Sequence, residues 1–406
     1  MGSSAQVADI VIVGAGLVGA TLAASIASQA ENQSLSIVII DQGDAPGLPS
    51  LTLDPPIFDA RVVALTHASV ELLKSIGAWS IVVQQRACFY RHMTVWDNDG
   101  TADIHFDAHE LHQEALGVIV ENQILLCAVL DILAQYKNVE FIRHQSVESI
   151  GFCGQNRELV LSNGNCLQAA LVCAADGANS KVRELLNFPM RNWSYEHKAI
   201  VTTVKSEKSH QFTAWQNFLS TGPLAFLPLD HPSEQYCSIV WSVENDEADH
   251  LMALSDDEFK QSLALAFECR MGVVESIGQR FCFPLVQRHA IHYIEQQLAL
   301  VGDAAHTIHP LAGQGVNLGL LDAKALSIEI GYAVKRRLPL SDTSLLRRYQ
   351  RQRKKHNLET MLLMESFKRL FGSRNIAMRW LRNQGMKSVN HIKPLKNWLA
   401  KQAMRV

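Results

Sequence analysis

The first forty residues contain the feature that most constrains how this chain can fold. An apolar run, Asp9–Val13, leads directly into the sequence GAGLVG at 14–19. An alanine-rich stretch of helical character follows to about Ala30, and a second apolar run, Leu35–Ile40, ends at Asp41. Strand, glycine turn, helix and strand within about 35 residues predict a βαβ unit, and therefore a parallel sheet with helices packed on it.

The spacing of the three glycines predicts a dinucleotide site. Gly14 permits the tight turn, Gly16 lets a pyrophosphate approach the backbone, and Gly19 lets helix and strand pack closely. Asp41 lies 22 residues beyond Gly19 and is expected to accept hydrogen bonds from ribose hydroxyls. A GxGxxG sequence alone is weak evidence and could be a fortuitous turn. Its place between a strand and a helix, with an acid at this distance, supports the dinucleotide interpretation.

A second glycine-rich segment lies near the end of the chain. The apolar run Leu298–Val301 precedes Gly302 and Asp303; small residues, Pro310 and a Gly313-Gln-Gly315 turn follow, and a helix is expected from Asn317. Such a turn points consecutive backbone N–H groups and a helix N-terminus at one spot, which suits an anion or an electron-rich ring edge. Two other interpretations stay open: an ordinary strand-to-helix connection, and Asp303 as a cap for the residues after it.

Composition sets the class of protein. With 406 residues the chain supports two or three domains, and no apolar run reaches the ~18 residues that a membrane helix needs. Eight cysteines show neither a CxxC pair nor metal-ligand spacing. They predict reduced thiols of a cytoplasmic protein, and no metal site is expected.

The charge is unevenly distributed. Residues 347–406 contain sixteen Lys or Arg and two acids, while residues 1–346 contain 21 basic and 38 acidic side chains. An acidic body with a basic C-terminal segment indicates an anionic partner, either a lipid surface or an acidic protein subunit. A solvated helical face is the alternative.

Strand-like and helical patterns suggest how the chain is divided. A third nucleotide-type element, the strand Leu171–Ala175 closing on Asp176 and Gly177, precedes a largely β stretch from about 191 to 283. We expect an α/β fold: a discontinuous Rossmann-like cofactor-binding domain (5–90, 110–190 and 284–345), an inserted mainly β substrate domain (91–109 and 191–283) and a basic helical region (346–406). Phe226 and Trp241 in the β stretch are expected in the sheet core rather than against substrate.

Together the three elements resemble the class A flavoprotein monooxygenases, the aromatic hydroxylases built like p-hydroxybenzoate hydroxylase. The markers are GAGLVG at 14–19, ADGANSKVR at 175–183 and GDAAHTIHPLAGQGVNLG at 302–319. Within that class the chain looks most like the UbiH/UbiF/VisC ubiquinone-biosynthesis hydroxylases, with the VisC type nearest. That narrower resemblance rests on DARVVAL at 59–65, YRHMTVWD at 90–97, GVIVEN at 117–122, FLPL at 226–229 and CSIVWS at 237–242.

The resemblance implies FAD as the cofactor and NAD(P)H as a co-substrate. Gly14, Gly16 and Gly19 would hold the pyrophosphate, and Arg61 would lie near it. Asp41 would bind the adenosine ribose, although the family more often has Glu at this position. Asn122 stands where relatives place Arg or Gln against the ribityl chain. Asp303 would bind a ribityl hydroxyl. The backbone amides of Val316 and Asn317, which follow the Gly313–Gly315 turn, would hydrogen-bond the O2 region of the flavin. Asp176 and Gly177 belong to a segment that in relatives serves both FAD and the nicotinamide nucleotide.

The resemblance also implies the reaction: hydroxylation of the aromatic ring of a polyprenylphenol or benzoquinol, using NAD(P)H and O2 through a flavin C4a-hydroperoxide. Such chemistry belongs to the cofactor, so the protein must place the ring and exclude water. Pro310 would present its carbonyl near the reacting edge. His306 and His309 flank this loop and are either acid–base groups or structural hydrogen-bonding residues. Arg61 could equally form a surface ion pair.

Alternatives to this function stay open. The chain could hydroxylate a small soluble aromatic acid, reduce an isoprenoid double bond on the same fold, or serve as a non-catalytic FAD-fold subunit of a biosynthetic complex. The expected partners are a lipophilic polyprenylated phenol and, through the basic C-terminus, an anionic membrane or an acidic subunit. No nucleic acid is expected, and a homo-oligomer or ubiquinone-biosynthesis complex is possible. The expected location is the cytoplasm, with peripheral attachment to the inner membrane.

Overall fold

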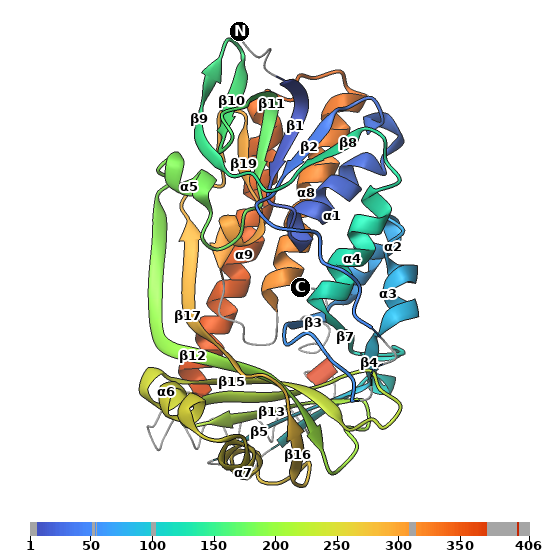
Figure 1. Ribbon diagram of the computed structural model, residues 1–406, viewed down its shortest axis with the longest axis vertical. Coiled ribbons are helices and arrows are strands. Elements are labelled where there is room, and N and C mark those ends of the chain that lie inside the picture. The colour runs from blue at the N-terminus through green and yellow to red at the C-terminus, as the bar shows by residue number, and fades with distance from the viewer. Residues whose placement is uncertain are drawn as a thin grey trace.

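Three β-sheets and the helices around them form the protein (Figure 1). The computed structural model describes residues 6–50, 53, 55–98, 103–307, 314–371 and 396–397. One large sheet and most of the helices occupy the upper half of Figure 1, and a second large sheet closes the lower end. This is the expected α/β architecture with a helical C-terminal segment.

The upper sheet contains the predicted βαβ unit. Its path runs β18-β19-β11-β1-β2-β8, and β1 pairs in parallel with both β2 and β11. The end of β1 and all of β2 are buried, which is typical of parallel strands covered on both faces. The strands are β1 (Gln6–Val13), β2 (Ile37–Ile40), β8 (Val139–Ile142), β9 (Val147–Cys153), β10 (Asn156–Leu161), β11 (Cys166–Ala174), β18 (Ile294–Glu295) and β19 (Leu298–Leu300).

The helices of this half pack mainly against one another and the upper sheet. Helix α1, which is apolar on all sides, packs against α4 and α8, and α8 packs against α9. The helices are α1 (Leu17–Ala27), α2 (His67–Ser75), α3 (Trp79–Gln85), α4 (Asn122–Leu133), α5 (Lys181–Leu185), α8 (Gln314–Lys335) and α9 (Thr343–Phe371), with single turns η1 (Ala30–Asn32), η2 (His109–Leu111) and η3 (Gly302–Ala304).

A small antiparallel sheet lies between the two halves (Figure 1). Strand β7 (Gly117–Glu121) pairs with β3 (Val62–Leu65) and with β4 (Cys88–Tyr90). Because β3 also contacts α8, this sheet lies beside the cofactor-type segments predicted from the sequence.

The lower sheet follows the path β20-β17-β12-β15-β14-β13-β5-β6, with β16 beside β12. Helices α6 (Asn245–Ala253) and α7 (Asp256–Ala266) pack on it, and its core contains Phe226 and Trp241, as expected. Residues 91–106 alternate strand-wise around the turn-type sequence Asp97–Gly100, which predicts a hairpin, and the β5–β6 pair confirms it. The strands are β5 (His92–Asp97), β6 (Asp103–Asp107), β12 (Met190–Ser206), β13 (Thr213–Leu219), β14 (Gly222–Pro228), β15 (Tyr236–Glu244), β16 (Val274–Ile277), β17 (Phe281–Ala290) and β20 (His306–Thr307).

Two long strands connect the halves. Strands β12 and β17 pair from Met190 opposite Ala290 to Val201 opposite Phe281, and Figure 1 shows them running side by side down the molecule. The domain boundaries expected at 190/191 and 283/284 fall inside these strands. The chain therefore crosses between the two sheets within paired strands, whose register shifts between Ser194 and Lys198.

Several local expectations need correction. Helix α8 begins at Gln314, three residues before the expected start at Asn317, and α3 and α6 are helices that the sequence patterns did not predict. The helical C-terminal region is seen as α9, to Phe371; most of the sequence beyond it lies outside the described residues. Within the described ranges, every helix is too short or too polar to cross a lipid bilayer.

Candidate cofactor site

The glycine loop after β1 is shaped by close approaches of backbone to backbone. Gly14 has φ +103°, and a Cβ there would lie 2.4 Å from the carbonyl oxygen of Ala175. A Cβ on Gly19 would lie 2.0 Å from the carbonyl oxygen of Gly14. A Cβ on Gly16, by contrast, would meet nothing within 4 Å, and no side chain caps the start of α1 there. This loop therefore offers open space beside free helix N-terminal amides, which suits a phosphate.

Asp41 follows β2 and lies against the same loop. Its carboxylate accepts hydrogen bonds from the backbone N–H of Ala15 at 2.6 Å and of Gly43 at 2.8 Å. The predicted ribose ligand is thus brought to the glycine turn. Each oxygen already accepts one amide hydrogen, so a ribose hydroxyl would use the remaining lone pairs.

Arg61 and Asn122 meet at the end of the small sheet. The backbone N–H of Asn122 donates to the carbonyl of Arg61 at 2.9 Å. The Arg61 side chain is exposed, 4.0 Å from the Asp59 carboxylate, so it forms the surface pair considered above. The Asn122 side-chain oxygen is buried without a hydrogen-bond partner among the described residues. A buried amide oxygen of this kind fits a ligand hydroxyl.

Asp176 and Gly177 follow β11 at the neighbouring strand end. One Asp176 carboxylate oxygen accepts from the Val182 N–H at 3.1 Å; the other is buried and finds no partner in the described ranges. The Arg183 guanidinium connects this segment to η3, after β19, because it donates hydrogen bonds to the carbonyls of Ala178 (2.7 Å) and Ala304 (3.0 Å). The loops after β1, β11 and β19 therefore converge at the carboxyl ends of adjacent parallel strands, where open α/β sheets bind ligands.

Asp303 lies in η3, directly after β19. No side chain caps this turn, so the capping alternative for Asp303 gains no support. The carboxylate is surrounded by protein on most sides yet exposed on one, and desolvation raises its pKa. Gly302 and Gly319 both lie against Val18 of α1, where a Cβ on either would come within about 3 Å of the valine methyls. Asp303 and the start of α8 are thereby held near the glycine loop.

The start of α8 is fixed by the side chain of Asn317. Its Oδ1 accepts from the Thr66 N–H (3.0 Å) and the Ser69 hydroxyl (2.7 Å), and its Nδ2 donates to the Ala64 carbonyl (2.8 Å). The expectation for Val316 and Asn317 concerned their backbone amides; the structural role of the Asn317 side chain was not foreseen. Gly315 lies in the first turn of α8, whereas His309, Pro310 and Gly313 lie outside the described residues.

A buried polar cluster beneath this loop was also missed. Asp322 of α8 is fully buried, and its carboxylate meets His306 and, from α9, Arg353. The sequence signal was an acid within the apolar helical run LGLLDAKAL at 318–326. His306 is completely buried here, which favours its structural interpretation over acid–base chemistry.

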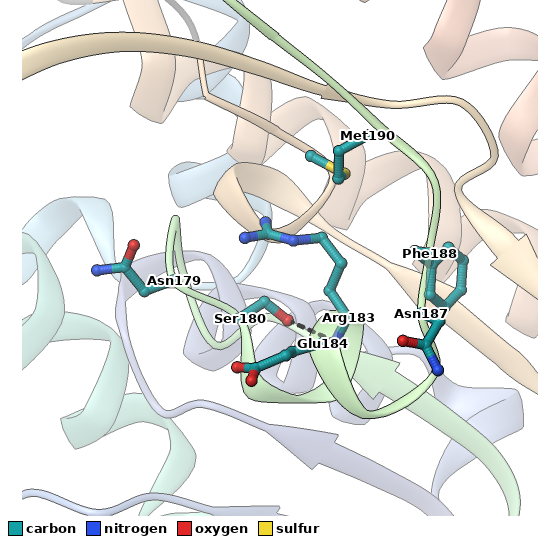
Figure 2. A pocket seen from close by; sticks show the side chains of 7 residues that line it. All are labelled: Asn179, Ser180, Arg183, Glu184, Asn187, Phe188 and Met190. Atoms are coloured by element: carbon teal, nitrogen blue, oxygen red, sulfur yellow. Dashed lines mark hydrogen bonds between the residues drawn. The ribbon is translucent and has the colours of Figure 1, made fainter.

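A polar cavity opens beside the Asp176–Gly177 segment (Figure 2). It has a volume of about 440 Å³, and its lining includes two side chains of opposite charge, Arg183 and Glu184. All of its lining comes from the stretch that follows Gly177: Asn179, Ser180, Arg183, Glu184, Asn187, Phe188 and Met190.

One group in the described ranges has the composition of a metal site, although none was expected. Ligand atoms of His92, His105 and Asp107 lie within 4.8 Å of one another on the β5–β6 hairpin. Thr94 already bonds to His105 Nδ1 (3.0 Å) and the His109 amide to Asp107 (2.8 Å). The hairpin belongs to the lower sheet, away from the loops above (Figure 1).

These residues fit FAD. The open Gly16 face with its helix N-terminal amides suits a pyrophosphate. The side-chain oxygens of Asn122 and Asp176 that lack a partner in the part of the chain the structure describes suit hydroxyl donors. The half-enclosed carboxylate of Asp303 offers a further acceptor on the same side.

Comparison with known proteins gives the same picture. A family model described as an FAD binding domain matches residues 7–361. The 3-demethoxyubiquinol 3-hydroxylase of Escherichia coli is 34% identical over 98% of this chain and 99% of its own. The ubiquinone biosynthesis monooxygenase COQ6 of Caenorhabditis elegans is 32% identical over 96% of this chain and 94% of its own. Ubiquinone hydroxylase UbiL of Rhodospirillum rubrum is 33% identical over 99% of this chain and 91% of its own.

Solved structures agree in fold. The p-nitrophenol 4-monooxygenase PnpA of Pseudomonas putida superposes with a TM-score of 0.77 at 19% identity, covering 98% of both chains. PqsL of Pseudomonas aeruginosa, described as a probable FAD-dependent monooxygenase, superposes with a TM-score of 0.76 at 21% identity, covering 94% of this chain and all of its own.

Proposed function

Because the chain belongs to the ubiquinone-biosynthesis hydroxylase family of FAD-binding proteins, we propose that it is an FAD-dependent monooxygenase that hydroxylates the ring of a polyprenylated phenol or quinol. The observation that carries the proposal is the convergence of three strand-end loops beside the open face of Gly16, where one oxygen each of Asn122 and Asp176 has no hydrogen-bond partner among the described residues. In the balanced reaction, a ring C–H becomes C–OH while O2 supplies one oxygen to the product and one to water, and NAD(P)H supplies two electrons.

FAD supplies the redox chemistry when it is bound: it accepts hydride from NAD(P)H and activates oxygen for transfer to an electron-rich ring. The protein's own part is binding and electrostatics. We assign the pyrophosphate to the Gly14–Gly19 loop, the adenosine ribose to Asp41, and ribityl hydroxyls to Asp303 and Asn122. The first amides of α8 would face the electron-rich edge of the flavin, because a helix N-terminus stabilises developing negative charge there.

We assign the nicotinamide nucleotide to the cavity beside Asp176 and Gly177, since its polar lining and the Arg183 guanidinium suit a polar, anionic ligand. The names of the relatives support the ring substrate: they concern ubiquinone biosynthesis and a demethoxyubiquinol, and the rings of such compounds carry a prenyl chain.

The experiment that tests the proposal begins with the absorbance spectrum of the purified protein. NAD(P)H-driven oxygen uptake is then measured with a short-chain 2-prenylphenol, with p-hydroxybenzoate and without substrate. We expect a bound flavin and uptake stimulated by the prenylphenol alone. Stimulation by p-hydroxybenzoate alone would favour a hydroxylase of small soluble aromatic acids. Bound flavin without stimulation by either compound would favour a non-catalytic subunit. A protein that cannot take up FAD would refute the proposal.

A lipid substrate gives the basic C-terminal segment a role. Arg347, Arg351 and Lys355 are exposed and four residues apart, so they share one face of α9. We propose that this face docks on anionic lipid head groups, at ~1 kcal/mol per cation close to the surface. Changing all three to Gln should abolish sedimentation with phosphatidylglycerol vesicles and leave FAD binding unchanged. Unaltered sedimentation would refute the lipid role and favour an acidic partner protein. Deleting 347–406 would be a poorer test, because it removes Arg353 from the core.

A further inference from the structure

The carboxylate of Asp322 joins two parts of the molecule through its two oxygens. Oδ2 accepts from the Gly302 N–H at 3.1 Å and from His306 Nε2 at 2.5 Å, which lie in η3 and at the start of β20, in the segment after β19. Oδ1 accepts from Arg353 Nε at 2.6 Å and from Asn357 Nδ2 at 3.3 Å, both in α9. One fully buried side chain therefore connects the loop to the C-terminal helix.

This carboxylate is charged in the folded protein. Burial by itself would raise the pKa of Asp322, but His306 and Arg353 outweigh it and lower the pKa to about 2. A buried ion pair of this kind is costly, and a well-packed apolar pair often stabilises a fold as well or better. Stability alone is therefore a weak reason for an Asp–Arg pair at this place.

The contacts made by Oδ2 fall on either side of Asp303. Gly302 immediately precedes Asp303, and His306 follows it three residues later, so both ends of this short segment are attached to the same carboxylate. Further bonds attach α9 nearby: the Tyr349 hydroxyl donates to the Leu300 carbonyl at 2.8 Å. Arg353 itself is held by Asn357 Oδ1 at 2.9 Å.

We propose that Asp322 is a positioning residue for the flavin, and that Arg353 of α9 holds it in place. The inference rests on the assignment of Asp303 to FAD in the proposed function. Through Asp322, the Gly302–His306 segment keeps Asp303 turned towards the cofactor site, and the fixed position of α9 becomes a condition for tight flavin binding. Neither Asp322 nor Arg353 needs to touch FAD for this role.

The variants are Asp322→Asn, Arg353→Met and the two combined. Asp322→Asn leaves the buried Arg353 without its carboxylate, and Arg353→Met takes one of the two cationic partners from Asp322. The double variant removes the Asp322–Arg353 pair as a whole, so it should recover much of the stability that the singles lose. The matched control is Arg348→Met. It removes another α8–α9 ion pair, between Arg348 Nε and Glu329 at 2.6 Å, which lies outside the Asp322 cluster. Arg353→Lys keeps the charge if a more disruptive change prevents folding.

Two measurements are made on each variant: hydrogen exchange of the peptide spanning 298–307 in the apoprotein, and FAD affinity at a temperature where the apoprotein is folded. We expect the Asp322 and Arg353 variants, including the double, to lose exchange protection in this peptide and to bind FAD at least tenfold more weakly. Arg353→Lys should fall between them and the wild type. The Arg348→Met control should match the wild type in both.

The outcomes separate the possible failures. If the double variant regains wild-type FAD affinity together with its stability, the pair is only structural and the proposal is wrong. Wild-type exchange and affinity in folded single variants would also overturn it. If the wild-type protein itself binds no FAD, the proposed function fails instead, and the exchange measurement on the apoprotein still reports whether Asp322 orders the loop.

Discussion

At the scale of single residues, the three glycines of the N-terminal loop differ in what they do. Gly14 and Gly19 make room for backbone that is already in place, whereas Gly16 faces open space. The sequence predicted these separate roles correctly for Gly14 and Gly19 as turn and packing residues, because the GxGxxG spacing follows from βαβ geometry. The assignment of Gly16 to pyrophosphate stays a prediction.

Alanine substitutions distinguish these roles. Gly19→Ala places a Cβ 2.0 Å from the Gly14 carbonyl oxygen, so we expect a loss of about 3 kcal/mol in the free energy of unfolding. Gly16→Ala should leave apoprotein stability within about 0.5 kcal/mol, because the site is open, but weaken FAD binding more than tenfold. Urea unfolding and flavin titration measure the two effects. Equal stability losses in both variants would contradict this account.

His289 predicts a pH dependence. Burial, with a smaller effect from the nearby His306, lowers the pKa of His289 from 6.5 to about 4. The unfolded chain therefore binds a proton between pH 6.5 and 4 that the folded protein does not. The stabilising contribution is complete above pH 6.5 and falls by roughly 3 kcal/mol as the pH drops to 4.

Urea midpoints measured between pH 7.5 and 4.5 check this expectation. His289→Gln keeps an acceptor for the Tyr293 hydroxyl and should reduce the slope, whereas His250→Gln, at an exposed position on α6, should not. An unchanged slope in His289→Gln would show that other groups cause the acid sensitivity.

At the scale of elements, sequence reasoning succeeded where a local pattern determines the structure. The βαβ unit, the β5–β6 hairpin and the buried strand before Asp176 follow from apolar runs and turn residues. Helices α3 and α6 were missed because they are short, with 7 and 9 residues, and α6 lies on a sheet-rich stretch. The Asp322–Arg353 pair could not be found from spacing, because it depends on how α8 packs on α9.

The start of α8 provides a test at this scale. Asn317→Ala removes an acceptor for Thr66 and Ser69 and a donor to Ala64, all buried or nearly so. We expect a loss of about 3 kcal/mol and weaker FAD binding, because α8 is then less firmly held. Thermal unfolding with and without FAD measures both. Asn245→Ala, at an exposed helix position, is the control; a similarly small effect in both variants would contradict the anchoring role.

At the scale of the whole molecule, two sheets are joined by paired strands rather than by a separate segment of chain. The β12–β17 pairing, which extends on both sides of a register shift at 194–198, couples the upper and lower halves. We therefore expect the apoprotein to unfold in one cooperative transition, with equal calorimetric and van't Hoff enthalpies. Two resolved transitions would show that the halves are independent domains, as the boundaries expected from the sequence imply.

The central claim is that the protein transfers oxygen from O2 to a prenylated ring, and one measurement tests it most directly. The flavin-loaded protein is incubated with NAD(P)H, a short-chain 2-prenylphenol and ¹⁸O2, and the product is analysed by mass spectrometry. Our account predicts a hydroxylated prenylphenol that carries one ¹⁸O atom. Oxygen consumption that yields only hydrogen peroxide, with the phenol recovered unchanged in the presence of bound FAD, would contradict it.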